Sequence, residues 1–130
     1  MNFPAELKYT TNDEWIRVEG DSGVVGLTDY AQDQLSDIVY VEFSGAPGQQ
    51  IAKGAGFASV ESVKAAADVY MPVDGEILET NAQLPTQPES INSDPYGAAW
   101  LAKIKIRDAT QLDGLMDAAA YEAFCQERQA

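Results

Sequence analysis

Several short stretches of this chain alternate apolar and polar residues, a period of two that is typical of half-buried β-strands. Residues 15–19 alternate in this way, residues 20–23 have the composition of a turn, and residues 24–27 return as a second strand. Together they predict a β-hairpin. Thr28 or Asp29 can then cap a short helix.

The middle of the chain has the pattern of further short strands joined by loops. Glycine and proline mark residues 44–50 as a loop and residues 81–97 as mostly loop, and Asp74-Gly75 is a strong turn signal. The strand-like stretches between these loops are residues 37–43, the two sides of residue 64, and residues 76–80. We therefore expect a mainly β protein.

The C-terminal third begins with one more strand and ends in helices. Residues 100–106 alternate, and placing their two lysines outward puts Leu101 on the exposed face with them. Asp108 and Gln111 have the spacing of a capping box, with Asp in the capping role. A short helix should follow this box, and a second helix is predicted near residues 118–128.

The length and charge of the chain restrict its partners. Its 130 residues fit one domain, taken as residues 1–130. The sequence has 8 lysines and arginines but 21 aspartates and glutamates, which gives a formal net charge of −13. Such an excess argues against nucleic acid and anionic membrane surfaces, because both require cationic partners. It favours a monomer in solution and can steer docking onto basic patches of larger proteins.

The residue types that are scarce restrict the chemistry. The sequence has no histidine, which excludes Ser–His and Cys–His catalysis and histidine-ligated metal sites. We expect its one cysteine, Cys125, to be a small buried or half-buried residue rather than a reactive one. No self-sufficient active site is evident, so we expect a protein that is not an enzyme. The opening MNFPAELKYT has neither the apolar run of a signal peptide nor the arginines of a transit peptide. The prediction is a cytoplasmic bacterial protein, mitochondrial only if a transit peptide has been removed.

One lysine stands out in the segment VESVKAAADVY, residues 60–70. Lys64 lies between two strand-like stretches, and the three alanines after it are too small to crowd a group that approaches its amine. An exposed hairpin tip presents a side chain with little steric cover. The ordinary interpretation is a solvated lysine. The neighbourhood favours a second hypothesis, in which a modifying enzyme uses Lys64 as an attachment point.

The longer segment ESVKAAADVYMPVDGEILETN closely resembles the lipoyl-lysine segment of the H-protein family of the glycine cleavage system. Four other segments resemble H-protein segments in the family's order, so that the resemblance runs from about Leu7 to Phe124. They are LKYTTNDEWIRVEG, VGLTDYAQDQLSDIVYVEF, INSDPYGAAWLAKIKI and YEAFC.

The resemblance implies a fold, a cofactor and a set of partners. The fold would be the flattened β-barrel, or barrel-sandwich hybrid, of lipoyl and biotinyl carriers, with a C-terminal helical tail at about 108–128. Lys64 would carry lipoate through an amide, on a lipoyl hairpin at about 57–80. The arm would shuttle the aminomethyl group of glycine from a PLP-dependent glycine decarboxylase to a tetrahydrofolate-dependent aminomethyltransferase. A dihydrolipoyl dehydrogenase would reoxidise it, and lipoylating enzymes would be further partners.

In this family the loaded arm folds back into a surface cleft. Glu14 and Asp68 match family positions near that cleft, where a carboxylate can pair with an aminium. The chain departs from the family pattern at three positions. Asp13 stands where the family usually has histidine, Gln34 where it often has histidine, and Ala99 where it often has glycine.

Three other roles remain open. A lipoyl donor or relay would use the same Lys64 arm to supply lipoyl groups to other enzymes. A biotin carrier usually has methionine on both sides of its lysine, whereas Val63 and Ala65 flank Lys64 here. An unmodified interaction module would bind a partner through its acidic face alone.

Overall fold

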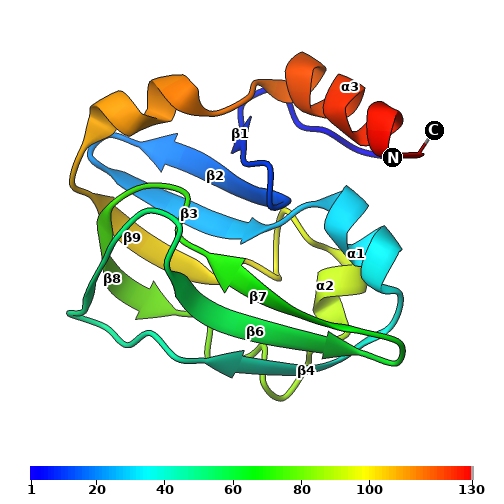
Figure 1. The fold of residues 1–130 in the computed structure, drawn as a ribbon. Coiled ribbons are helices and arrows are strands. Elements are labelled where there is room, and N and C mark those ends of the chain that lie inside the picture. The colour runs from blue at the N-terminus through cyan, green and yellow to red at the C-terminus, as the bar shows by residue number, and fades with distance from the viewer. Residues whose placement is uncertain (130) are drawn as a thin grey trace.

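The structure is a computed structural model that describes residues 1–129. Most of this chain lies in short β-strands, and the longest helix is at its C-terminal end (Figure 1). In chain order the elements are β1 (Lys8–Tyr9), β2 (Glu14–Glu19), β3 (Ser22–Leu27), α1 (Asp29–Leu35), β4 (Ile38–Phe43), β5 (Gln50–Ile51), β6 (Gly56–Ser62), β7 (Ala66–Tyr70), β8 (Gly75–Thr80), α2 (Ser90–Ser93), β9 (Ala102–Ile106), the 3-10 helix η1 (Ala109–Gly114) and α3 (Ala118–Gln129).

The strands form two antiparallel sheets with the main core between them. The larger sheet has the order β1-β2-β3-β9-β8-β5, and the smaller has the order β4-β6-β7 (Figure 1). Apolar side chains of both sheets meet in one cluster, among them Ile16 of β2, Val60 of β6 and Ile104 of β9, all three wholly buried. The prediction of a mainly β protein is confirmed. Among residues 1–129, none of the helices has the length and apolar character that a membrane span requires.

The predicted hairpin and the helix after it are both present. Residues 15–27 form β2 and β3, which pair antiparallel. Thr28 is the N-cap of α1, because its Oγ1 accepts a hydrogen bond from the backbone N–H of Ala31 at 3.1 Å. Asp29, the alternative cap, is the first residue of the helix.

The strand predicted at residues 100–106 is β9, with both of its lysines exposed. Leu101 was predicted to share their exposed face, and this is wrong, because Leu101 is wholly buried in the main core. It lies just before the regular strand, where the period of two no longer sets the direction of the side chain.

The predicted capping box at Asp108 and Gln111 is present only in its first half. Asp108 Oδ1 accepts the backbone N–H of Thr110 at 3.1 Å and caps η1. The side chain of Gln111 does not return to Asp108, since its Oε1 accepts the backbone N–H of Asp74 at 2.7 Å. A distant partner has replaced the local one, and this bond ties the start of the tail to the residue before β8. The second predicted helix is α3.

Helix α3 packs on the larger sheet through a second, mostly aromatic cluster. Tyr121 of α3 stacks on Tyr9 of β1 with 4.6 Å between ring centroids, and both rings are wholly buried beside Trp15. Cys125 belongs to the same cluster and is 2% exposed, as predicted for a structural cysteine. Helix α3 therefore covers the larger sheet at its β1 edge (Figure 1).

We expect Gly26→Ala to destabilise this fold, because the added Cβ would lie 2.6 Å from Cζ2 of Trp15. The Trp15 indole N–H donates to the carbonyl oxygens of Leu27 and Pro95, at 2.9 and 3.1 Å, so the ring cannot move aside without losing these bonds. The expected loss in the free energy of unfolding is about 1–3 kcal/mol, measured by urea denaturation. Gly56→Ala is the control, because its Cβ would come no closer than 3.8 Å to a neighbour. Equal losses in the two variants would contradict the steric explanation.

Candidate functional site

Lys64 lies in the turn that joins β6 to β7, at one end of the smaller sheet. The Ser62 hydroxyl organises this turn by accepting the backbone N–H groups of Lys64, at 3.3 Å, and of Ala65, at 3.0 Å. The Ser62 N–H also donates to the Ala65 carbonyl at 2.7 Å. The N–H of Val63 donates to the Asp37 carbonyl at 3.1 Å, which ties the tip to the start of β4. The Lys64 side chain therefore projects from an ordered backbone.

The Lys64 side chain is open to solvent. Residues 63–66 are all exposed, and Val63 reaches 67%. The ion pairs in the part of the chain that the structure describes do not include Lys64. A modifying enzyme would thus meet an accessible amine with no ionic partner to displace.

A cavity of about 160 Å³ lies beside this hairpin, between β7, α1 and the loop before β2. Its lining residues are Asn12, Asp13, Leu27, Ala31, Gln34, Leu35, Ala67 and Asp68. Asp68 is exposed and stands on the strand that follows the Lys64 turn. Two of the three departures from the H-protein pattern, Asp13 and Gln34, line this cavity, while Ala99 is buried in the main core. We call it the hairpin cavity.

Glu14 has a different environment from Asp68, because its side chain is only 1% exposed. Its Oε1 accepts the Thr10 hydroxyl at 2.6 Å, and its Oε2 accepts the backbone N–H of Tyr70 at 3.2 Å. Glu14 lines a second cavity, of about 150 Å³. The structure thus places the two predicted carboxylates on neighbouring cavities rather than in one, and Asn12 lines both.

Burial raises the pKa of Glu14 from 4.5 to about 7. The hydrogen bonds from Thr10 and from the Tyr70 N–H oppose this rise, and the nearby Asp13 carboxylate adds to it. Lys53 lines the same cavity as Glu14. Near neutral pH the Glu14 carboxyl group is therefore a mixture of acid and carboxylate, and it can gain or lose a proton when a charged group arrives.

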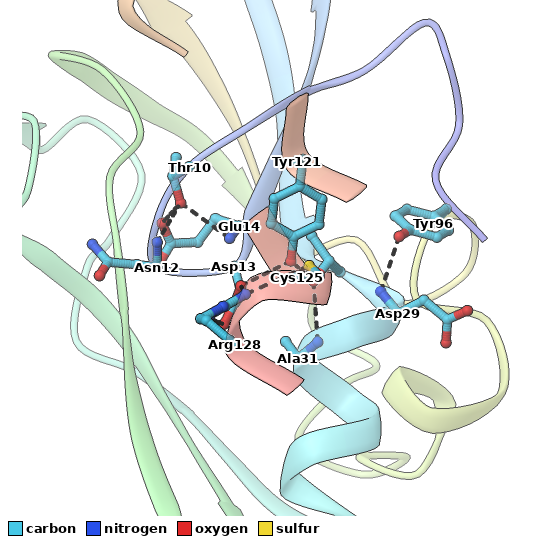
Figure 2. Close-up of polar contacts among 11 residues, drawn as sticks. Thr10, Asn12, Asp13, Glu14, Asp29, Ala31, Tyr96, Tyr121, Cys125 and Arg128 are labelled. Atoms are coloured by element: carbon cyan, nitrogen blue, oxygen red, sulfur yellow. Dashed lines mark hydrogen bonds and ion pairs between the residues drawn. The ribbon is translucent and has the colours of Figure 1, made fainter. Parts of the chain in front are cut away.

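Figure 2 shows a polar network around Asp13 that sequence reasoning missed. Arg128 donates from Nη2 to Oδ1 of Asp13 at 2.6 Å and from Nη1 to Oδ2 at 3.1 Å. The Tyr121 hydroxyl donates to the same Oδ1 at 2.8 Å and lies 2.6 Å from Oγ1 of Thr28. Asp13 and Arg128 are 115 positions apart, so no local spacing could have indicated the pair. The one signal was the unusual residue at position 13.

We expect Glu14→Gln to change how stability depends on pH. The folded-state pKa of Glu14, about 7, lies above its ordinary value of 4.5, so the native state keeps the proton over this interval. The stability that this group contributes is fully present below pH 4.5 and is lost as the pH rises through about 7. Between those limits wild type should lose about 3 kcal/mol relative to Glu14→Gln, measured by urea denaturation across the pH range. Parallel curves for the two proteins would show that the carboxyl group titrates normally.

Comparisons of sequence and of structure relate this chain to known proteins over nearly its whole length. The family model described as "Glycine cleavage H-protein" matches residues 7–128. The glycine cleavage system H protein of Symbiobacterium thermophilum is 48% identical, over 97% of this chain and 98% of its own length. That of Laribacter hongkongensis is 54% identical, over 93% and 95%. The crystal structure of a glycine cleavage system H protein from Mycobacterium marinum matches with a TM-score of 0.80 at 29% identity, over 98% of this chain and 99% of that one. The predicted barrel-sandwich carrier fold is confirmed, and this chain belongs to the glycine cleavage H-protein family.

Proposed function

We propose that this chain is the lipoyl carrier of a glycine cleavage system and that lipoate is attached to Nζ of Lys64. The observation that carries the proposal is the position of Lys64 in a member of the H-protein family. Its amine is exposed on an ordered turn, and it belongs to none of the ion pairs found among residues 1–129. A carrier needs no catalytic residues of its own, which agrees with the absence of histidine from the sequence.

The turn suits acylation. The neutral amine attacks an activated lipoyl carboxyl group, an N–C bond replaces one N–H bond, and the activating group leaves from the carbonyl carbon. The small side chains of residues 65–67 leave room for the modifying enzyme. The amide removes the positive charge of Lys64, and because no ion pair depends on that charge among the described residues, modification should leave the fold unchanged.

The partners follow from the proposed role. When bound, the lipoyl dithiolane supplies the redox-active sulfurs that accept the aminomethyl group of glycine. The proposed partners are a PLP-dependent glycine decarboxylase, a tetrahydrofolate-dependent aminomethyltransferase, a dihydrolipoyl dehydrogenase and the lipoylating enzymes. Tethering raises the effective concentration of the arm at each docked active site to about 1 mM or more, as for a short flexible linker.

The hairpin cavity fits an arm of this kind. Leu27, Ala31 and Leu35 give it an apolar wall that suits a hydrocarbon chain, and Asp68 gives it an exposed carboxylate that suits a cation. We propose Asp68 and Glu14 as the carboxylates of the arm cleft. Glu14 would act from the neighbouring cavity, where its raised pKa allows it to ionise when a cation comes near.

We also propose that residues 1–130 act as one carrier domain in the cytoplasm. The family model covers nearly all of the chain, and the relatives named above are bacterial. In this domain, residues 57–80 would present and support the arm, and the tail at 108–128 would cover the larger sheet. The same Lys64 arm would also serve a lipoyl relay, and the assay below separates the two roles.

The surface around Lys64 suits docking. Val39 and Tyr40 of β4 are 55% and 45% exposed, and Val63 stands next to Lys64. Tyr40 lies opposite Glu61 in the pairing of β4 with β6, so anions border this apolar patch. We propose that the patch docks against the entrance of the decarboxylase, which would carry an apolar rim and basic residues.

We expect Lys64→Arg to abolish carrier function while leaving the fold intact. Arginine keeps the charge at this exposed position, so the free energy of unfolding should change by no more than about 0.5 kcal/mol. Its guanidinium is not acylated, so the intact mass should lack the lipoyl increment that wild type acquires in its own cell. Glycine–bicarbonate exchange with purified decarboxylase should fall by a factor of about 100 or more.

Each outcome of this experiment has one meaning. Retained exchange in Lys64→Arg, or a wild-type protein without a lipoyl group on Lys64 in a lipoate-sufficient cell, would refute the proposal. A biotin increment would indicate a biotin carrier instead. A lipoylated wild type that supports no exchange, but donates its lipoyl group to other enzymes, would establish the relay.

We expect Val39→Ala to weaken docking to the decarboxylase. The KM for the carrier in the exchange assay should rise about fivefold, with kcat unchanged at saturation, because the substitution removes apolar contact but leaves the arm in place. Leu78→Ala is the matched control, since Leu78 is 46% exposed but lies on β8 of the other sheet. A similar rise in KM for the two variants would exclude a specific patch.

A further inference from the structure

Strand β7 forms one wall of the hairpin cavity, and helix α3 holds the other two walls from outside. One wall is the loop before β2, which contains Asp13, and the other is α1, which begins after its cap Thr28. The side chains of α3 that reach these walls are Tyr121 and Arg128 (Figure 2). The cavity itself has no lining residue from α3.

Asp13 is the anchor of the first wall. Its φ is 68°, in the left-handed region, which residues other than glycine adopt infrequently, although aspartate and asparagine do so more often than most. Arg128 holds both of its carboxylate oxygens, at 2.6 and 3.1 Å, and Tyr121 adds a third bond at 2.8 Å. A guanidinium fork on a carboxylate fixes orientation as well as position. The unfavourable backbone conformation of Asp13 is therefore held by side chains of α3.

The second wall is held by the same two side chains. The Arg128 guanidinium lies 4.3 Å from the ring centroid of Tyr30 on α1 and 4.3 Å from that of Phe124 on α3. The Tyr121 hydroxyl lies 2.6 Å from Oγ1 of Thr28, the group that caps α1. Each side chain thus contacts the loop and α1 at once.

The anchored loop also shapes the Glu14 site. The Thr10 oxygen accepts the backbone N–H of Glu14 at 3.1 Å and that of Asn12 at 3.2 Å, while its own hydroxyl donates to Glu14 Oε1 at 2.6 Å. The Asp13 carbonyl accepts the N–H of Thr28 at 3.0 Å. A shift of Asp13 would therefore move Asn12, which lines both cavities, and loosen the burial of Glu14.

We propose that Arg128 and Tyr121 are positioning residues for the arm cleft, acting as a clamp that fixes Asp13 and Thr28 and so sets the two walls. This inference rests on the proposed lipoyl function, because it assigns the cleft to the arm. Neither residue lines the hairpin cavity, so neither would contact the arm there. The competing role is a simple fastening of α3 to the sheet, which would affect global stability but not the environment of Glu14 in the folded protein.

The test uses the full-length chain with Arg128→Ala, and Arg107→Ala is the matched control. Arg107 also binds a carboxylate, Glu76 at 2.7 Å, but lines neither cavity. The first readout is the NMR titration of the Glu14 carboxyl carbon in protein without lipoate. If the clamp acts as proposed, Arg128→Ala admits water to Glu14 and lowers its midpoint by about one pH unit.

The sign of this shift separates the two roles. Removing the Arg128 charge alone, with the loop unmoved, would favour the neutral acid and raise the Glu14 midpoint or leave it unchanged. A loosened loop should also speed amide hydrogen exchange at Asn12 and Glu14 by about tenfold. Arg107→Ala should change neither measurement.

The second readout uses lipoylated protein. After loading from glycine by the decarboxylase, ammonia released to buffer without the aminomethyltransferase reports the loss of the carried unit to water. Arg128→Ala should release it about fivefold faster than wild type, because its cleft shields less well. If Arg128→Ala does not fold, Arg128→Lys and Tyr121→Phe replace it, since each removes part of the clamp and keeps most of the packing.

A Glu14 midpoint that stays or rises in folded clamp variants, with unchanged hydrogen exchange, would overturn the clamp. So would equal ammonia release by wild type and variant. Failure of wild type to acquire lipoate would instead refute the proposed function. The Glu14 titration and the amide hydrogen exchange require no lipoate, so they would still decide whether Arg128 sets the position of the loop.

Discussion

The site depends on a partly buried hydrogen bond between the two sheets. The Glu14 carboxyl group of β2 accepts the backbone N–H of Tyr70, the last residue of β7. The first strand belongs to the larger sheet, and the second belongs to the hairpin that carries Lys64. An N–H that is shielded from water and has no acceptor is costly, so Glu14 helps to set where the base of this hairpin lies. Burial of the carboxyl group has its own cost, which is expressed as a pKa of about 7. The contact between Glu14 and Tyr70 thus has two consequences. It attaches the hairpin to the larger sheet, and it places a titratable group beside the cavities.

The hairpin combines a fixed base with an exposed tip. Val60 and Val69 are wholly buried in the main core, whereas Val63, at the turn, is 67% exposed. The Ser62 hydroxyl accepts two backbone N–H groups of the turn, so hydrogen bonds rather than apolar contacts order the tip. A carrier arm benefits from this division, because a fixed attachment point limits where the arm can search. The mobile part is then the side chain of Lys64 and whatever it carries.

Local signals predicted most of the fold, and contacts between residues far apart in the sequence explain what they missed. The hairpin at 15–27 and the cap at Thr28 depend on residues a few positions apart, which a sequence displays directly. Gln111 was assigned to the wrong partner because Asp74, 37 positions away, competes for its side chain. The burial of Glu14 was equally hidden, since the N–H that it accepts lies 56 positions away. Position in a sequence reports the type of a charged residue but not the low-dielectric surroundings that move its pKa.

The residue at position 13, where the resemblance leads one to expect histidine, has its partner far along the chain. A histidine there would change its charge near neutral pH. Asp13 instead accepts a guanidinium fork from Arg128, a contact that a histidinium cannot make because it has no acceptor. Arginine stays protonated throughout the physiological range, so the cation of this pair does not respond to pH. The neighbouring carboxyl group, Glu14, lines the other cavity, and there burial raises its pKa to about 7.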